Sequence, residues 1–226
     1  MTDTALVVPS YERTALLDYV LGLAVEHLKP SEVVVIHNGP ARLYGAACGI
    51  KSVNFPGATV SQSFNLGATI SSAKNLLFMH NDLILWSGPE DPRFDVTGYV
   101  VVNQDGELIN EFAIDSVGVG RPYAVNLSVP KEGRECVAVG TVLMSMRRDL
   151  YDSLGGFDES MGYDHFDVDF CLRAKRAGAT IGVQLAPNAL HIGGARHPSH
   201  AAAVRQQLDG YVYTLKRINE HGPTRS

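Results

Sequence analysis

Short, uninterrupted apolar runs alternate with helical patterns over the first 85 residues, and this alternation restricts the possible folds more than any other feature. The apolar runs are residues 5–8, 33–36 and 76–79, and residues 50–55 form a further candidate strand. Strands that are buried on both faces of a sheet show such continuous runs. Residues 15–28 and 64–73 have the apolar spacing of helices. The pattern predicts an α/β fold with a Rossmann-like, mainly parallel central sheet flanked by helices.

Polar side chains follow three of these strands at the point where each strand ends. The clusters are Ser10-Tyr11, His37-Asn38 and His80-Asn81-Asp82. Ligands of such sheets bind outside the carboxyl ends of the strands. We therefore expect the three clusters to meet at one edge of the sheet and to form part of a binding site.

The remainder of the chain predicts a small insertion and a second group of elements. Asp105-Gly106 lies between two apolar runs and indicates a hairpin within a loop-rich stretch, residues 86–134. Further strands are expected at residues 137–146, 179–184 and 189–190, and further helices at residues 148–154 and 166–177. Helical spacing near the end predicts a C-terminal helix within residues 198–226, which docks on the core or pairs with another subunit.

Composition limits the classes of function. The chain has 226 residues and a formal net charge of −5, with no run of Lys and Arg, so a nucleic-acid groove is not indicated. Cys48, Cys136 and Cys171 are widely spaced, which argues against a disulfide framework or a CxxC pair. We find no apolar run near the ~18 residues of a membrane span. The N-terminus does not have the pattern of a signal peptide, and a cytoplasmic location is expected.

The segment from Gly155 to Arg173 is the most acidic part of the chain. Its carboxylates are Asp158, Glu159, Asp164, Asp167 and Asp169, and His165 lies among them. Carboxylates repel one another and are costly to bury. A short segment that carries so many is therefore either a solvated turn or one wall of a site.

Several short motifs occur in one order along most of the chain. They are Val7-Val8-Pro9-Ser10-Tyr11, residues 32–39, Asn65-Leu66-Gly67, residues 77–82, Gly155-Gly156-Phe157-Asp158-Glu159, Asp167-Val168-Asp169-Phe170-Cys171-Leu172-Arg173 and His191. This order resembles the family 2-type inverting glycosyltransferases with a GT-A fold, with rhamnosyltransferase-like motifs. The resemblance implies one GT-A domain over residues 1–226. Residues 1–85 would bind the nucleotide sugar, and residues 86–197 would form the acceptor and catalytic half. Apart from the resemblance, the apolar spacing of the C-terminal helix allows a homodimer.

The resemblance also implies individual roles. Asp167 matches the catalytic base that takes a proton from an acceptor hydroxyl. Asp82 and His191 match the ligands of a divalent cation, Mn²⁺ or Mg²⁺, which assists departure of the nucleoside diphosphate. The donor-binding positions are Pro9, Ser10, Tyr11, His37, Asn65, His80 and Asn81. Asp169 and Arg173 are expected to pair at helical spacing behind the base.

Each of these roles has a structural alternative. Asp82 could cap a turn, and His191 could be an ordinary hydrogen-bonded histidine. Tyr11 could be a half-buried loop aromatic. Asn65 could cap its own helix, and Asp167 could be a helix N-cap without any chemistry.

Three positions depart from the family pattern. His37 and His80 stand where the family has acids in the nucleotide-binding half, and Phe166 replaces an acid before the base, which predicts a more apolar rim. The two histidines motivate an alternative function, a non-catalytic GT-A-like module that binds a nucleotide or a sugar. A sugar nucleotidyltransferase is a third hypothesis, but residues 9–13 lack the glycines of its phosphate loop.

Overall fold

The computed structural model describes residues 3–11, 15–39, 49–103, 108–109, 132–161 and 165–192. Several sequence predictions fall outside this part of the chain. They are the Asp105-Gly106 turn, the C-terminal helix with its proposed homodimer contact, Cys48 and Asp164.

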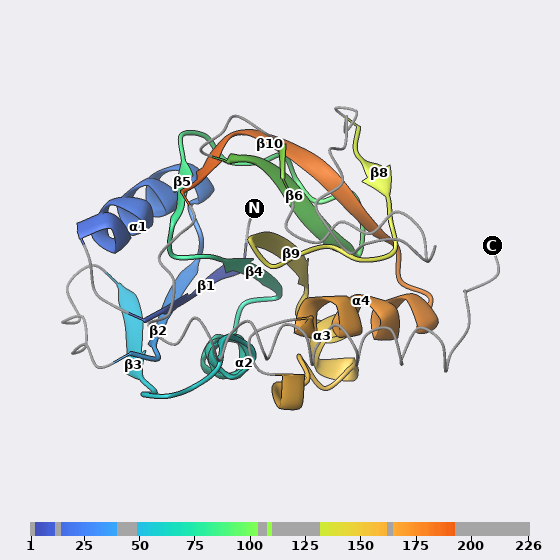
Figure 1. The fold of residues 1–226 in the computed structure, drawn as a ribbon, viewed down its shortest axis with the longest axis horizontal. Helices are drawn as coiled ribbons and strands as arrows, with labels where there is room; N and C mark the ends of the chain where they lie inside the picture. Colours follow the sequence, from blue (N-terminus) through green and yellow to red (C-terminus); the bar gives the residue numbers. More distant parts are fainter. Residues whose placement is uncertain are drawn as a thin grey trace, which may run out of the picture.

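A single mixed sheet forms the centre of the molecule (Figure 1). Its strands are β1 (Thr4–Ser10), β2 (Glu32–His37), β3 (Ile50–Asn54), β4 (Asn75–Met79), β5 (Leu83–Leu85), β6 (Val96–Asn103), β7 (Leu108–Ile109), β8 (Arg134–Glu135), β9 (Leu143–Arg147) and β10 (Ile181–His191). They lie in the order β3-β2-β1-β4-β9-β6-β10-β5, with β7 beside β6 and β8 beside β10.

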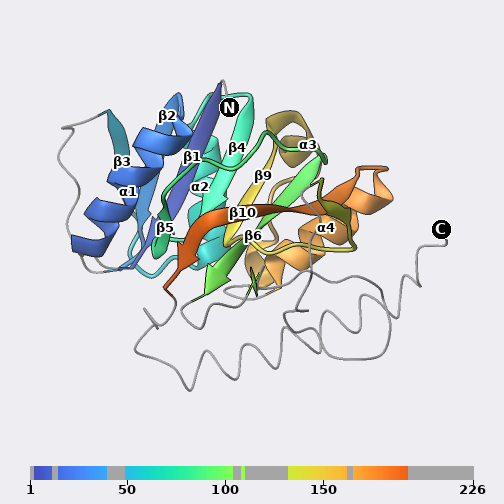
Figure 2. The same ribbon diagram turned by 90° about the horizontal axis from the view of Figure 1, so that it is seen from above.

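Strand direction divides the sheet into two parts. Strands β3, β2, β1 and β4 are parallel to one another, as the alternation of strands and helices predicts (Figure 2). Strand β9 is antiparallel to both β4 and β6, and β5 is antiparallel to β10. The fold class is therefore confirmed, but the sheet is more mixed than the sequence pattern indicates.

Helices cover both faces of the sheet (Figure 1). One face carries α1 (Ala15–Leu28), and the other carries α2 (Val60–Ile70), α3 (Arg148–Ser153), the short 3₁₀ turn η1 (Glu159–Met161) and α4 (Phe166–Arg176). Alternate residues of β1 serve the two faces, as the period of a strand requires. Leu6 and Val8 pack in the core under α1, whereas Ala5 and Val7 pack in the core under α2 and α4.

Several element boundaries differ from the sequence predictions. Helix α2 begins at Val60 rather than Phe64, because Thr59 and Gln62 form a reciprocal capping box. Strand β9 begins at Leu143, and residues 137–142 before it contain only an isolated β-bridge at Ala138. The two short strands expected at residues 179–184 and 189–190 are one strand, β10, with a register shift between Leu185 and Leu190.

The helices of the described segments are all too short or too polar to cross a membrane. Cys136 and Cys171 are both buried free thiols.

Candidate functional site

The ends of β1, β2 and β4 meet at one edge of the sheet, as the sequence predicts. Ser10 pairs with His37 at the last position of the β1–β2 ladder. The backbone N–H of Asn38 donates to the carbonyl of Ser10 at 3.0 Å, and Asn81 Nδ2 donates to Ser10 Oγ at 3.5 Å. The three polar clusters therefore form one group, although they come from separate parts of the chain.

Burial differs among the predicted donor-binding residues in this group. Pro9, Ser10 and His37 are buried, whereas Tyr11, His80 and Asn81 are half-buried. Tyr11, His80 and Asn81 are therefore the side chains of this group that a ligand at the edge of the sheet could contact. Tyr11 fits its structural alternative, a half-buried loop aromatic, as well as a donor contact.

Gly39 has a direct reason to be glycine. A Cβ atom at this position would lie 1.5 Å from the backbone oxygen of Tyr11, so no other residue fits without moving the backbone. The chain that leaves β2 therefore passes directly against the chain that leaves β1.

His80, Asp82 and His191 form a compact cluster at the same edge. One ligand atom from each residue can be chosen so that all three atoms lie within 4.8 Å of one another. His191 Nε2 lies 3.1 Å from Asp82 Oδ1, and the centroids of the His80 and His191 rings are 5.5 Å apart. Asp82 and His191 are buried and His80 is half-buried.

Strand pairing explains how His191 reaches residues so far away in the sequence. Strand β9 is antiparallel to both β4 and β6, and β10 is parallel to β6. These reversals cancel, so β10 runs in the direction of β4 and its carboxyl end lies at the same edge of the sheet. His191 pairs with Leu83, and the N–H of Ile192 donates to the carbonyl of Asp82 at 3.1 Å.

The Asp82 carboxyl is held in its charged form. Burial by itself would raise the pKa of Asp82, but the hydrogen bond from His191 and the positive charge available on His191 and His80 outweigh this effect. The pKa of Asp82 therefore lies below its usual range. A carboxylate beside two imidazoles is a set of donors that suits a divalent metal ion.

Asp167 lies at the start of α4 and is almost fully buried, with 3% of its surface exposed. Its Oδ2 accepts from the N–H of Thr141 at 3.3 Å, and its Oδ1 accepts from the N–H of Val168 at 2.9 Å. The N-cap of α4 is His165, which adopts a left-handed conformation with φ of 62°, so the alternative that Asp167 is the N-cap is wrong.

One backbone segment connects Asp167 to the histidine cluster. Thr141 donates to the Asp167 carboxylate, and the carbonyl of the next residue, Val142, accepts from the N–H of His80 at 3.1 Å. The sequence prediction placed residues 137–146 in one strand and missed this connection. Gly140 within the supposed strand is a signal that could have indicated a loop.

Asp169 and Arg173 form the ion pair that their helical spacing predicts. Arg173 Nε donates to Asp169 Oδ2 at 2.7 Å. The two terminal nitrogens of Arg173 donate to the carbonyls of Leu154 at 2.7 Å and Gly156 at 2.8 Å. The pair therefore fixes the Gly155-Gly156 turn onto α4.

Asn65 connects α2 to the same turn. Its Nδ2 donates to the carbonyl of Phe157 and to Glu159 Oε1, each at 2.9 Å. Its Oδ1 accepts from the N–H of Phe157 at 2.9 Å and from the hydroxyl of Tyr151. Thr59 caps α2, so the alternative that Asn65 caps its own helix is wrong. The amide already uses both of its N–H groups within the protein.

Phe166 corrects one expectation. The sequence predicts an apolar rim at this position, but Phe166 is 2% exposed and belongs to the core. Its ring centroid lies 5.0 Å from that of Phe157 and 6.1 Å from that of Phe64. The position before Asp167 points inward because α4 packs this face onto the sheet. Asp158 has the expected turn role, since it accepts from the N–H and hydroxyl of Ser160.

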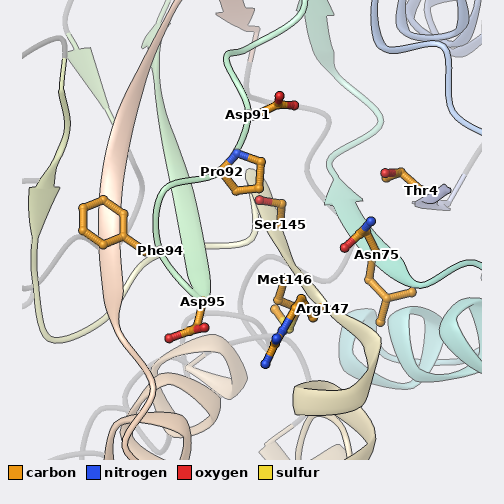
Figure 3. Close-up of a pocket in the computed structure, with 10 residues that line it drawn as sticks. Thr4, Asn75, Asp91, Pro92, Phe94, Asp95, Ser145, Met146 and Arg147 are labelled. Carbon is orange, nitrogen blue, oxygen red and sulfur yellow. The ribbon is translucent and has the colours of Figure 1, made fainter. Parts of the chain in front are cut away.

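A separate cavity of about 250 Å³ lies at the opposite edge of the sheet (Figure 3). Thr4 and Asn75 line it at the amino ends of β1 and β4, and Arg147 lines it where β9 ends beside Asn75. Asp91 and Pro92 close another side. The cavity is therefore distinct from the group at the carboxyl ends of the strands.

Comparison with solved structures identifies the fold. The chain superposes on GalNAc-T7, whose crystal structure contains UDP, GalNAc and Mn²⁺, with a TM-score of 0.71 and 13% identity over 94% of this chain. It also superposes on a fragment, residues 1–349, of S. aureus TarS (TM-score 0.59, 15% identity, 84% of this chain) and on S. aureus TarS itself (0.58, 14%, 85%).

The chain spans about half of the GalNAc-T7 chain, 48%, and 60% and 37% of the two TarS chains. No protein-family model matches the sequence. No curated protein matches it either. The structural similarity shows that the chain has the GT-A fold of glycosyltransferases.

Proposed function

We propose that this protein is a glycosyltransferase that moves a sugar from a nucleoside-diphosphate sugar to an acceptor hydroxyl with inversion at the anomeric carbon. The proposal rests on one observation. The buried carboxylate of Asp167 is connected through residues 141–142 to the cluster of His80, Asp82 and His191, whose donor atoms suit a metal ion. His80 and Asp167 bond to the adjacent residues Val142 and Thr141. The GT-A fold and a structural neighbour that holds UDP, GalNAc and Mn²⁺ support transfer from a nucleotide sugar.

Asp82 and His191 would hold a divalent cation, since their donor atoms lie 3.1 Å apart at the carboxyl ends of the strands. When bound, the cation would neutralise the charge that develops on the leaving diphosphate. The nucleotide would lie along Tyr11 and Asn81, with the buried Pro9, Ser10 and His37 beneath it. Because the Asn65 amide holds the turn at Phe157, we assign Asn65 a supporting role in place of donor contact.

Asp167 would act as the general base. An Asp167 oxygen takes the proton of the acceptor hydroxyl, while that hydroxyl oxygen forms a bond to the anomeric carbon of the donor sugar. The bond between the anomeric carbon and the diphosphate oxygen breaks, and the diphosphate leaves with the electron pair. Attack from the face opposite the leaving group inverts the anomeric centre. Thr141 and Val168 keep the carboxylate in a fixed orientation throughout.

Residues 86–197 would supply the acceptor side of the site, since Asp167 belongs to this half. Arg173 and Asp169 would support the base indirectly. They hold the Gly155-Gly156 turn against α4, the helix that carries Asp167.

The test compares Asp167→Asn with the wild type. A first screen identifies the donor by measuring hydrolysis of UDP-, GDP- and dTDP-sugars with and without Mn²⁺. We then expect Asp167→Asn to bind the nucleoside diphosphate as tightly as the wild type and to lose transfer by about 10² to 10⁴-fold. Asp152→Asn, an exposed carboxylate on α3, is the matched control and should retain full transfer.

Unchanged turnover in Asp167→Asn would remove this residue from the mechanism. The screen also separates the proposal from the alternative of a non-catalytic binding module. Metal-dependent turnover of any donor argues for the transferase. Tight binding of a nucleoside diphosphate without turnover of any donor argues for the module.

A further inference from the structure

We propose that the cavity at the amino ends of β1 and β4 binds one neutral sugar residue, at a site separate from the carboxyl edge of the sheet. Thr4 and Ser10 are the first and last residues of β1, so at about 3.3 Å per residue the two sites are about 20 Å apart. The cavity would therefore hold a sugar without taking part in transfer. This inference goes beyond the proposed function and does not depend on it.

The strand register gathers polar side chains on one face of the sheet at this edge. Thr4 pairs with Asn75 and Asn75 pairs with Arg147, so three neighbouring strands present one polar row. Ser145 lies two residues before Arg147 on β9 and shares this face. Thr4 and Ser145 are 2% and 3% exposed, so these two residues form the floor of the cavity.

The segment that contains Asp91 forms the opposite wall, and buried contacts hold it in place (Figure 3). Gln184 is buried; its Oε1 accepts from the N–H of Arg93 at 2.7 Å, and its Nε2 donates to the carbonyl of Asp91 at 3.3 Å. The ring of Phe94 lies so close to Gly182 that a Cβ there would be 2.4 Å from it. The cavity is therefore formed before any ligand binds, which lowers the entropic cost of binding.

The charges of the lining favour an uncharged occupant. Asp91 and Asp95 are acidic and Arg147 is basic. Hydrogen bonds from the N–H and hydroxyl of Thr180, with the positive charge of Arg147, outweigh burial and keep the pKa of Asp95 below its usual range. An anion in the cavity would meet two carboxylates, and a cation would meet the guanidinium group.

The remaining lining matches the surface of a sugar ring, which carries hydroxyls around apolar C–H groups. The two floor hydroxyls and the Asn75 amide can each donate and accept hydrogen bonds, and the Asp91 carboxylate accepts them. Leu76 and Met146 add apolar surface. Figure 3 shows the polar side chains around one shared space. The volume of about 250 Å³ is just below the range of about 300 to 1,000 Å³ that holds drug-sized ligands, which limits the occupant to about one sugar ring.

The experiment titrates the ¹⁵N-labelled full chain with glucose, N-acetylglucosamine and rhamnose, and follows its amide signals by NMR. We expect at least one of these sugars to shift the amides of Asn75 and Arg147. UDP with Mn²⁺ should not displace it. Because the ligand is uncharged, its affinity should be the same at about 0.05 M and about 0.5 M salt.

Variants of the lining test which residues bind the sugar. Asp91→Ala, at an exposed position, and Thr4→Val, which removes one floor hydroxyl, should each weaken binding by at least about fivefold. Asp152→Ala removes an exposed carboxylate on α3 and is the matched control, with unchanged affinity expected. Circular dichroism of each variant checks that its fold is retained.

Three results would overturn the inference. The first is that no sugar of the panel shifts these amides, and the second is that UDP with Mn²⁺ displaces the bound sugar. The third is tighter binding of ethylammonium or inorganic phosphate at the same amides. Sugar binding is measured without any donor, so a protein that binds a sugar here and turns over no donor supports this inference and contradicts the proposed transferase.

Discussion

Replacing Arg173 by alanine should destabilise the protein by about 3 kcal/mol, because its guanidinium group donates three hydrogen bonds. Its Nε bonds to Asp169 at 2.7 Å, and its terminal nitrogens bond to the carbonyls of Leu154 at 2.7 Å and Gly156 at 2.8 Å. The Asp169 side chain is 5% exposed and that of Arg173 is 21% exposed. The substitution therefore leaves the Asp169 carboxylate and the carbonyls of Leu154 and Gly156 without the hydrogen bonds that Arg173 donates.

Two separate considerations give this magnitude. Three lost hydrogen bonds at about 1 kcal/mol each amount to about 3 kcal/mol. Breaking a buried ion pair by removing one partner costs about 3 to 5 kcal/mol. The exposed fifth of the Arg173 side chain shows that water can reach the pair in part. The lower end of the second range is therefore the appropriate value, and the two considerations agree.

Urea unfolding, followed by circular dichroism, measures the free energy of unfolding directly. For a domain of this size, a loss of about 3 kcal/mol lowers Tm by roughly 6 to 12 °C. Arg173→Lys keeps the charge but not the planar fork, so it should recover only part of the loss. Arg176→Ala, exposed on the same helix, is the control and should stay within about 0.5 kcal/mol of the wild type. If Arg173→Ala unfolds like Arg176→Ala, the reasoning is wrong.

Two further predictions concern the scaffold of the site. Gly67→Ala places a Cβ 2.2 Å from Val7 Cγ1, so it should destabilise the α2–β1 contact by about 1 to 3 kcal/mol. In Gly22→Ala on α1, the added Cβ has no neighbour within 4 Å, so this control should stabilise the protein by up to about 1 kcal/mol. Equal shifts in Tm for the two variants would contradict the packing argument. For Glu32, burial alone would raise the pKa, but hydrogen bonds from Lys51 and Ser72 lower it to about 2. Ionised Glu32 therefore contributes its full stabilisation of the folded state above pH 4.5, the pKa of the unfolded chain. This stabilisation is lost as the pH falls toward the folded-state pKa of about 2. Glu32→Gln should lower the free energy of unfolding by about 1 kcal/mol at pH 7. The value is small because the Lys51 side chain is half exposed and water screens the pair. In urea unfolding, the difference between this variant and the wild type should shrink as the pH falls toward 2.

The sequence predicted the parallel half of the fold well, because the signals there are local. The strands buried on both faces have continuous apolar runs, and their polar ends mark the carboxyl edge. These signals predicted that the three polar clusters meet at one edge, and Ser10 does pair with His37 and contact Asn81 there. The pair of Asp169 and Arg173 was predictable for the same reason, since helical spacing is a local property.

Other features of the site depended on contacts between distant segments. Asn65 bonds to Phe157, 92 residues away, and no local pattern reveals this partner. Phe166 was expected at a rim and lies in the core, because the orientation of α4 against Phe64 and Phe157 decides its direction. The segment at Thr141 and Val142, which joins Asp167 to His80, was hidden within an apolar run that resembles a strand.

The sequence by itself determined which residues stand at the ends of strands β1, β2 and β4, because hydrophobic periodicity is set by neighbours along the chain. Only the tertiary structure decided that His191 meets Asp82 and His80. This meeting requires the order β4-β9-β6-β10 and the two reversals within it, which return β10 to the direction of β4. Strand order depends on how whole faces of the sheet are buried, and periodicity within one segment carries no information about it.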